Sequence, residues 1–262
     1  MNTYISRNER EVSIAVWVVG VMVLWELAAF FLANVIQDPM AEKKLPYLHE
    51  VVILFGQHWQ SILKEAGITF TRAAYGFFFG AVIGFLLSVL MSLSKLVEKT
   101  AMPYLIMSQM IPILGLGPII FSLVKDLNTA RTVIAAYMTF FPVSVNTLSG
   151  FKSVDEDKRT LMYSYAAKKP QLYAKLMFPF TLPYLFTGLK IAAPMAVTAS
   201  ILVDTLSAKD GIGYKIVYSL YGGGTTGEFW PALITGAMMG VVSYAIMATA
   251  ERILVPWRKD AE

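Results

Sequence analysis

The sequence predicts an all-α membrane protein with about six transmembrane helices, forming a single domain over residues 1–262. Of its residues, 56% are hydrophobic and only 15% are charged, and the mean hydropathy is positive at +0.57. Long apolar runs recur along the chain, and about 20 such residues are enough to cross the hydrocarbon core of a bilayer. Composition and run length together indicate a multi-pass membrane protein rather than a soluble one.

Charge and cysteine content exclude several classes of function. The formal net charge of +4 arises from 22 Lys and Arg against 18 Asp and Glu. The basic residues gather in the loops expected on one side of the membrane, which indicates topology rather than a nucleic-acid surface. The chain has no cysteine, so disulfides, cysteine-ligated metal sites and thiol catalysis are excluded.

The apolar runs and the basic loops together predict the topology. Basic residues precede the first run and follow the last, and the positive-inside rule then places both termini in the cytoplasm. The largest basic group lies in the loop at 150–179, which is expected on the same side. The expected spans are residues 12–36, 67–93, 101–124, 129–149, 182–206 and 229–250.

The first span contains one acid, Glu26, directly after Trp25. An acid inside a span is a candidate functional group, because a carboxylate in lipid is costly. The alternative is a carboxylate at the outer interface or hydrogen-bonded to a neighbouring helix, and Trp25 favours it because tryptophan commonly anchors helices at the interface. The run is too long for the apolar core of a signal peptide, and no small-residue cleavage site is evident.

Residues 37–66 carry their apolar side chains at helical spacing on one face. This pattern predicts an amphipathic helix lying on the outer membrane surface or against other helices. His49 and His58 have no acidic or cysteine companion at metal-ligand spacing, so no metal site is expected here. The apolar stripe consists of Leu48, Val51, Val52, Phe55, Trp59, Ile62 and Leu63.

The second span, 67–93, contains Gly76, Gly80 and Gly84. Their spacing places them on one helix face, where they allow another helix to approach closely. Packing within one subunit is favoured over a dimer seam. Arg72, in the first turns of this span, either snorkels toward the outer surface or lines a polar pathway.

The third span, 101–124, contains the sequence IPILGLGP with Pro112, Gly115, Gly117 and Pro118. These residues are expected to interrupt the regular helical hydrogen bonds. Irregular backbone persists at membrane depth only where protein buries it or where it borders a wet cavity, and broken helices mark the translocation sites of many transporters. This segment and Arg72 are therefore the candidates for lining a pathway.

The fourth and fifth spans, 129–149 and 182–206, each contain a proline, Pro142 and Pro194. A proline inside a helix removes one backbone hydrogen bond, so a kink is expected at Pro194. Asp204 lies near the outer end of the fifth span, where an acid costs little. We therefore interpret Asp204 as an interfacial residue rather than a proton relay.

Residues 207–228 are predicted to form a flexible outer loop. Its GGGTTG sequence lacks the Lys-Ser/Thr ending of a phosphate-binding P-loop, so no nucleotide is expected to bind there. The sixth span, 229–250, carries Gly236 and Gly240 at the spacing used for close helix packing.

The loop between the fourth and fifth spans is polar but contains apolar residues at helical spacing. Ser153 and Glu156 have the spacing of a capping box, so a helix is expected to begin here. Pro170 is expected to be the first residue of a second short helix, which ends before Pro179. The basic residues of the loop are Lys152, Lys158, Arg159, Lys168, Lys169 and Lys175.

The first of these two helices presents Leu161, Met162 and Tyr165 on one face. An apolar stripe on a helix outside the membrane indicates a contact with another protein. We therefore predict that this loop is a docking element.

The same loop resembles the cytoplasmic loop of permease subunits in binding-protein-dependent ABC importers, whose motif is E-A-A-x3-G-x9-I-x-L-P. Pro179 is identical to the motif, and Leu176 and Phe178 are conservative replacements. The opening Glu-Ala-Ala is absent, and Ala166 stands where the family has glycine. The motif aligns without gaps on Thr160, Leu161, Met162, Ala166, Leu176, Phe178 and Pro179.

The resemblance covers nearly the whole chain and is to the sulfonate, nitrate, taurine and thiamine-precursor branch of type I importers. The segments FFPVSVNTLSGFKSVD and LPYLFTGLKIA flank the loop and are similar to that branch. The other similar segments are LPYLHEVV, TFTRAAYGFFFGAVIGF, IPILGLGPII and SAKDGIGYKI.

This resemblance implies a permease that works by alternating access while a separate cytoplasmic ATPase, which binds ATP and Mg, supplies the energy. It also implies an extracytoplasmic solute-binding protein and a second permease copy or homologue as partners, with no cofactor on this chain. Leu161 and Met162 would form an apolar knob on the docking helix. The residues implied to couple the chain to the ATPase are Thr160, Leu161, Met162, Tyr165, Ala166, Pro170, Leu176 and Pro179.

Two other classes of function are weighed against this one. A transporter driven by an ion gradient would bury acids or histidines in mid-membrane, and Glu26 is the candidate for such a site. A membrane-embedded enzyme would need paired acids, a metal motif or a nucleophile with its base, and the sequence shows no such arrangement.

Overall fold

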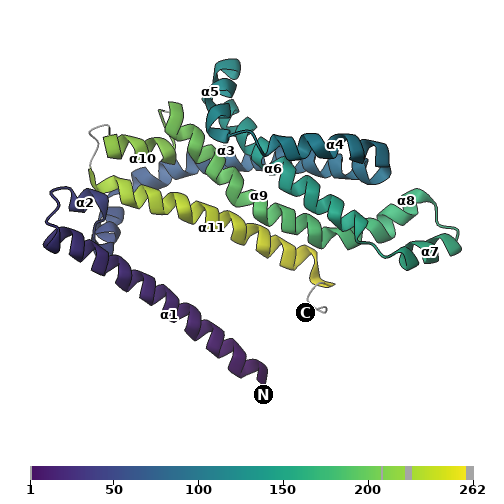
Figure 1. Ribbon diagram of the computed structural model, residues 1–262, viewed down its shortest axis with the longest axis horizontal. Helices are drawn as coiled ribbons and strands as arrows, with labels where there is room; N and C mark the ends of the chain where they lie inside the picture. Colours follow the sequence, from purple (N-terminus) through teal and green to yellow (C-terminus); the bar gives the residue numbers. More distant parts are fainter. Residues whose placement is uncertain (1, 208, 222–225, 258–262) are drawn as a thin grey trace.

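The computed structural model describes residues 2–207, 209–221 and 226–257, which are helical almost throughout (Figure 1). No strand occurs in this part of the chain, so the prediction of an all-α membrane protein is confirmed. The helical elements are α1 (Asn2–Phe30), η1 (Phe31–Val35), α2 (Ala41–Lys44), α3 (Leu48–Leu93), α4 (Lys95–Ser108), α5 (Ile113–Val124), α6 (Leu127–Lys152), α7 (Glu156–Ser164), α8 (Lys169–Leu172), η2 (Tyr173–Met177), α9 (Phe178–Ser207), α10 (Ile212–Tyr221), η3 (Thr226–Glu228) and α11 (Phe229–Leu254).

Within the described residues, five helical segments are long and apolar enough to cross a membrane, and α4 with α5 forms a sixth if the two are counted together. The axes of α4 and α5 differ by 98° across the break between them. The span expected at 101–124 is therefore a broken one. The unbroken segments are Ala15–Val35, Leu48–Leu93, Leu127–Lys152, Lys169–Leu206 and Phe229–Leu254.

Helix α3 is continuous over 46 residues, so the amphipathic helix expected within 37–66 and the span expected at 67–93 are one helix. At 1.5 Å per residue it is about 69 Å long, roughly twice the hydrocarbon thickness of a bilayer. Its first turns pack against other helices through part of their apolar stripe, while Val52, Trp59 and Leu63 of the same stripe are exposed. Val51 and Ile62 are only 3% and 0% exposed.

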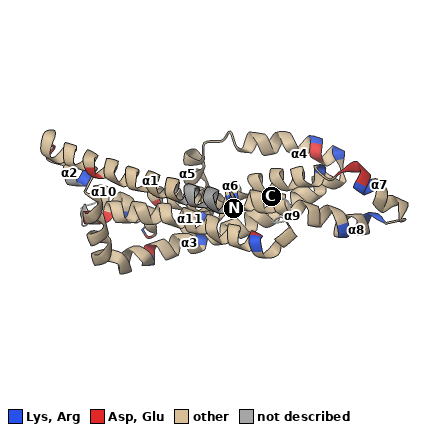
Figure 2. Cartoon of the chain, turned by 90° about the horizontal axis from the view of Figure 1, so that it is seen from below, with Lys and Arg blue, Asp and Glu red and all other residues tan. Residues whose placement is uncertain are grey.

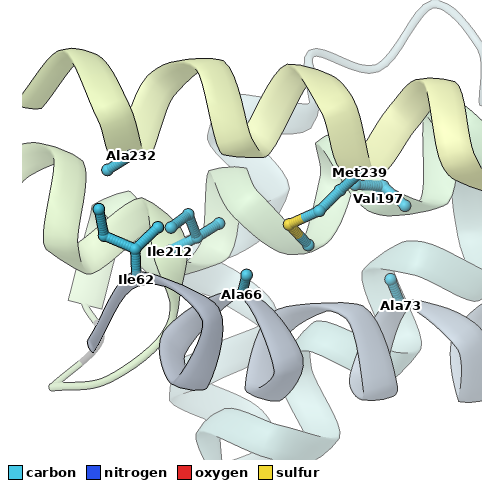
Figure 3. Close-up of a cluster of buried hydrophobic side chains, with 7 residues drawn as sticks. All are labelled: Ile62, Ala66, Ala73, Val197, Ile212, Ala232 and Met239. Atoms are coloured by element: carbon cyan, nitrogen blue, oxygen red, sulfur yellow. The ribbon is translucent and has the colours of Figure 1, made fainter. Parts of the chain in front are cut away.

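The apolar core at this part of α3 is built from four helices. Small side chains at the contacts allow the helix backbones to approach closely, as is usual between membrane helices. Figure 3 shows the buried residues, which are Ile62, Ala66 and Ala73 of α3, Val197 of α9, Ile212 of α10, and Ala232 and Met239 of α11.

The three glycines of α3 pack against α6 in the same chain. A Cβ atom at Gly76, Gly80 or Gly84 would lie 2.4 or 2.5 Å from a backbone carbonyl oxygen of α6, so no larger residue fits without moving the helices apart. Gly236 and Gly240 face α9 less tightly, since a Cβ there would lie 3.3 and 3.9 Å from its nearest neighbour.

The outer loop expected at 207–228 contains a helix, α10. Four residues of its GGGTTG sequence, 222–225, lie outside the described part of the chain. Helix α10 forms because Ile212 opens an apolar run that packs into the core of Figure 3. The prediction of an unstructured loop missed this burial.

The elongated molecule has two ends that carry most of the charged side chains (Figure 2). Helices α7 and α8 lie at one end, and α2 and α10 lie at the other (Figure 1). We call these the α7 end and the α10 end. Helix α1 runs apart from the bundle, and only 6% of its apolar stretch is buried.

Candidate functional site

The docking loop predicted from the sequence lies outside the helix bundle, at the α7 end. Asp155 caps α7, because its carboxylate accepts a hydrogen bond from the Asp157 N–H at 3.2 Å. The expected capping box of Ser153 and Glu156 is therefore wrong. Ser153 ends α6 instead, and its hydroxyl donates to a carbonyl of that helix at 3.0 Å. Both residues have the short polar side chain that caps a helix. Because α6 extends to Lys152, Ser153 is the last residue of that helix end and Asp155 caps α7.

Helix α7 presents two large apolar side chains away from the bundle. Leu161 and Tyr165 are one turn apart and are 56% and 79% exposed. Thr160 is also exposed. Met162 lies on the other side of the helix, where it packs against buried residues of the protein. Of the expected pair Leu161 and Met162, only Leu161 is therefore on the exposed face.

A buried apolar cluster, here called the anchor cluster, fixes this loop to the bundle. It contains residues from both chain segments that flank α7. The cluster therefore joins α7 to both segments through close-packed side chains. The anchor cluster consists of Phe151, Val154, Leu172 and Met177, with Val89, Met162, Tyr173, Leu176 and Phe180 packed against it.

Ala166 makes the bend after α7. Its φ angle is +55°, in the left-handed region, and its N–H donates to the Tyr163 carbonyl at 2.9 Å. Glycine is the usual residue at this point of a helix end, which explains the glycine in the motif. Alanine adopts the conformation at a cost of roughly 1–2 kcal/mol. Pro170 lies in the first turn of α8, one residue after the helix start at which it was expected.

The sequence suggested that the second helix of the loop ends before Pro179, but in the structure it continues. Helix α8 continues through η2 into α9 as one helical run over 169–207. Pro179 has no N–H for the carbonyl four residues earlier, and the wide turns of η2 just before it accommodate the missing bond. Leu176, Pro179 and Trp257 line an open hollow of about 320 Å³ beside this junction.

The expected pathway segment is interrupted over a shorter stretch than its composition suggested. Helix α4 ends at Ser108, and Pro112 is the N-cap residue of α5. Gly115, Gly117 and Pro118 lie within α5. The irregular backbone is therefore confined to residues 109–112.

Arg72 does not meet this break. It is half-buried and lies near Asp126, whose pKa is lowered chiefly by the hydrogen bond from the Thr129 hydroxyl and to a smaller extent by the charge of Arg72. Pro112 lies at the start of α5, and Asp126 lies just after its end. The 12 residues of α5 separate the two by about 18 Å. Arg72 therefore lies toward the Val124 end of α5, and the irregular backbone lies at the other end.

A buried ion pair lies near the α10 end, and we call it with its partners the polar cluster. The side chains of Arg131 and Asp204 are both 0% exposed, and Arg131 Nε lies 2.5 Å from Asp204 Oδ1. Asp204 lies near the end of α9, as expected, but its side chain is buried between helices and not exposed. The Arg131 guanidinium on α6 compensates its charge, which allows the carboxylate to be buried between helices.

Further hydrogen bonds connect this ion pair to its surroundings. The Thr69 hydroxyl donates to Asp204 Oδ2 at 2.6 Å. Arg131 Nη2 donates to both the carbonyl and the carboxylate of Asp210 at 2.7 Å, and Nη1 donates to Asn128 Oδ1 at 3.0 Å. The polar cluster thus joins α3, α6, α9 and the segment before α10.

Gly211 allows that segment to approach the ion pair closely. Its φ angle is +94°, and a Cβ atom would lie 2.4 Å from Asp204 Oδ2 and 2.9 Å from Arg131 Nη2. Its N–H donates to Glu65 Oε2 at 2.6 Å. Both the backbone conformation and the space require glycine.

Glu26, the acid of the first span, contacts a neighbouring helix. Its Oε1 accepts a hydrogen bond from the Leu48 N–H at 3.1 Å and lies 3.5 Å from His49 Nδ1. A carboxylate at the start of α3 is stabilised by the free N–H groups there. Among the described residues, no three His, Asp or Glu side chains are grouped to hold a metal ion.

Comparison with known proteins links this geometry to a family. Residues 76–259 match the binding-protein-dependent transport system inner membrane component. The formylaminopyrimidine transport permease protein ThiX of Halalkalibacterium halodurans is 33% identical over 91% of this chain and 92% of that protein. The nitrate import permease protein NrtB of Synechococcus elongatus is 25% identical over 83% and 78% of the two chains.

A third relative and a solved structure agree with this match. The putative aliphatic sulfonates transport permease protein SsuC of Bacillus subtilis is 27% identical, over 74% of this chain and 70% of that protein. A crystal structure of an amino acid ABC transporter with histidines has a TM-score of 0.61 at 16% identity, and the match covers 76% of this chain and 97% of that chain. The solved structure shows that the fold is shared.

Proposed function

The chain belongs to the family of binding-protein-dependent transport system inner membrane components, and on this premise we propose that its loop at 153–178 transmits the movement of an ATPase to the transmembrane helices. The protein is the non-catalytic permease subunit of an ABC importer for a small solute. It is a multi-pass inner-membrane protein, and importers of this kind work with an ATPase and a solute-binding protein. Family membership favours this function over the ion-gradient transporter and the membrane-embedded enzyme.

The geometry of α7 supports the docking proposal. Leu161 and Tyr165 form an exposed apolar pair on a helix that lies outside the bundle. An amphipathic helix of this kind can bind in an apolar groove of a partner protein. The anchor cluster holds the opposite face of α7, so the force of docking is carried into α6 and into the helical run over 169–207.

We place the α7 end and both termini in the cytoplasm. The basic residues of the loop at 150–179 support this orientation, because loops rich in Lys and Arg remain on the cytoplasmic side. The α10 end is then the side where the solute-binding protein docks. In this arrangement ATP and Mg are bound by the ATPase subunits, and a second copy or a homologue of this chain completes the transport pathway.

The names of the relatives indicate which solutes to test. They specify formylaminopyrimidine, nitrate and aliphatic sulfonates. We propose that this chain carries a small polar solute of the same range. A formylaminopyrimidine is the first to test, because the relative named for it is 33% identical over 91% of this chain.

Co-purification in mild detergent tests the docking element. Full-length chain is expected to recover an ATPase subunit, identified by mass spectrometry. The double variant Leu161→Asp/Tyr165→Asp is expected to lose it, because two carboxylates would be buried in an apolar contact. Lys168→Asp is the matched control, since it changes the net charge by the same amount at an exposed position of the same loop.

Size-exclusion chromatography of each variant separates loss of docking from loss of folding. A monodisperse Leu161→Asp/Tyr165→Asp variant without ATPase, beside a control that retains the ATPase, supports the proposal. Equal recovery of the ATPase with both variants refutes the role of α7. Uptake of the solute by the reconstituted complex then identifies the cargo.

A further inference from the structure

A basic cavity of about 300 Å³ lies at the α7 end, between the docking loop and the ends of α3, α4 and α6. Its charged lining consists of Lys95 and Glu98 from α4, Lys152 from α6, Arg159 from α7 and Lys169 from α8. Glu98 forms an ion pair with Lys152. In the described part of the chain, the other three cations of the cavity have no acidic partner.

Arg159 is the most constrained of these cations. Its Nη2 donates to the carbonyl of Phe151 at 2.9 Å, whereas its Nε is buried without a hydrogen-bond partner among the described residues. A buried N–H without an acceptor is costly, and an anion in the cavity would supply one. Guanidinium groups bind the oxygens of phosphate with paired hydrogen bonds, so Arg159 suits a phosphate in particular.

Uncharged donors complete the lining of the cavity. The hydroxyls of Ser92, Tyr163 and Tyr173 belong to residues that line it. The Ser92 hydroxyl donates to the Val89 carbonyl at 2.8 Å and lies 3.2 Å from Tyr173 Oη, so among the described residues Tyr163 has the hydroxyl that is left free to donate to an anion. The Tyr163 hydroxyl and the three cations around one small cavity are donors that phosphate oxygens accept from.

Exposed leucines surround one lining residue of the cavity, Leu93, in the sequence. Leu90, Leu93 and Leu96 at the junction of α3 and α4 are 54%, 57% and 75% exposed, and Leu93 also lines the cavity. Exposed leucines beside cations provide a surface for an acyl chain next to a site for a charged headgroup. Basic pockets between membrane helices bind anionic headgroups in this way.

We propose that this cavity binds a phosphate group, carried either by the headgroup of an anionic phospholipid or by free phosphate. Arg159 and Lys169 of the docking loop hold the phosphate from one side, and Lys95 holds it from α4. The bound anion thereby adds an electrostatic link between α7 and the bundle to the apolar link of the anchor cluster. The proposal is independent of the identity of the transported solute and of docking by an ATPase.

Retention of lipid by the purified full-length chain tests the proposal. The chain is placed in nanodiscs containing phosphatidylglycerol and phosphatidylcholine, and native mass spectrometry counts the lipids that remain bound after release. Lys95→Gln/Arg159→Gln is expected to reduce retention of phosphatidylglycerol about tenfold or more, because two charge-assisted contacts are lost. Lys99→Gln/Lys168→Gln is the matched control, since it removes two exposed cations near the cavity that do not line it.

A second cavity variant guards against a folding defect. Lys95→Gln/Lys169→Gln leaves Arg159 and its bond to α6 in place and is expected to show the same loss of phosphatidylglycerol. The source of the phosphate is settled by thermal unfolding in sodium phosphate against sodium chloride of equal ionic strength. Protection by phosphate that both cavity variants lose assigns the site to free phosphate. Equal lipid retention by all variants, without cavity-dependent protection by phosphate, overturns the proposal.

Discussion

Replacing Asp204 is expected to destabilise the protein severely. Asp204→Leu removes the carboxylate that Arg131 Nε contacts at 2.5 Å, and the buried guanidinium keeps only the half-exposed Asp210 as an acidic partner. It also removes the acceptor for the Thr69 hydroxyl and for the Gly213 N–H. Breaking a buried pair by removing one partner costs about 3–5 kcal/mol. That loss is a large part of the roughly 5–15 kcal/mol that stabilises a typical domain.

The double variant Arg131→Met/Asp204→Leu tests whether the two residues act as a unit. It leaves no unpaired charge in the pair, and replacing both partners of a buried pair by apolar groups is commonly close to neutral. The contacts of Arg131 with Asp210 and Asn128 are still lost. We therefore expect the double variant to be more stable than the sum of the single changes predicts, by about 1–3 kcal/mol.

Unfolding of the purified chain in mixed detergent micelles, followed by circular dichroism, measures these differences. Asp38→Asn is the control, because Asp38 pairs with Lys44 at 2.5 Å on the surface and exposed pairs contribute little. Strictly additive effects of Arg131→Met and Asp204→Leu would refute the view that the pair is a unit. An Asp204→Leu variant as stable as the parent would refute the buried charge itself.

Three further changes test other parts of the fold. Ala166→Gly is expected to raise the thermal unfolding temperature slightly, because it relieves roughly 1–2 kcal/mol of left-handed strain against about 1 kcal/mol of added chain entropy. Gly80→Leu is expected to destabilise the protein by about 1–3 kcal/mol by forcing α3 from α6, whereas Gly56→Leu, with open space around it, is not. The pKa of the Asp126 carboxyl is lowered from 3.8. The charged carboxylate therefore stabilises the start of α6 fully above pH 3.8, and this stabilisation is lost as the pH falls through the lowered pKa. Asp126→Asn should remove this acid dependence of the unfolding temperature.

Local sequence patterns located the membrane helices and the docking loop, but they did not locate the junctions. The apolar stripe ending at Leu63 indicated an amphipathic helix, and the structure confirms a helix there. The same stripe contains no signal that the helix continues through Gly67 into the next span. Likewise, Ser153 and Asp155 are equally good caps by residue type, and only the packing of α6 distinguishes them.

The polar cluster depends on partners that are distant in the sequence. Arg131 and Asp204 are 73 positions apart, and Glu65 and Gly211 are 146 positions apart. Helical periodicity places each residue on a face of its own helix, but it does not say which helix lies opposite. A basic and an acidic residue in neighbouring spans were the available signal, and the rule that charges in membranes are paired would have joined them.

The two functional ends of the molecule are connected through α6 and α9. Helix α6 carries Phe151 of the anchor cluster at one end and Arg131 of the polar cluster at the other. The helical run over 169–207, which includes α9, carries Met177 of the anchor cluster near one end and Asp204 of the polar cluster near the other. Between them the helices pack closely, since a Cβ atom at Gly188 would lie 2.8 Å from a backbone oxygen of α6. We therefore expect α6 and α9 to respond to a displacement of α7 as one body.

This rigidity leads to a prediction that separates docking from transmission. Arg131→Met/Asp204→Leu leaves Leu161 and Tyr165 untouched, so the ATPase is expected to remain bound. The outer ends of α6 and α9 would lose their link to α10, and stimulation of ATP hydrolysis by the loaded binding protein is expected to fall severalfold in reconstituted vesicles. Full stimulation in this variant would show that the polar cluster only stabilises the fold. Loss of the ATPase as well would show that the two ends do not act separately.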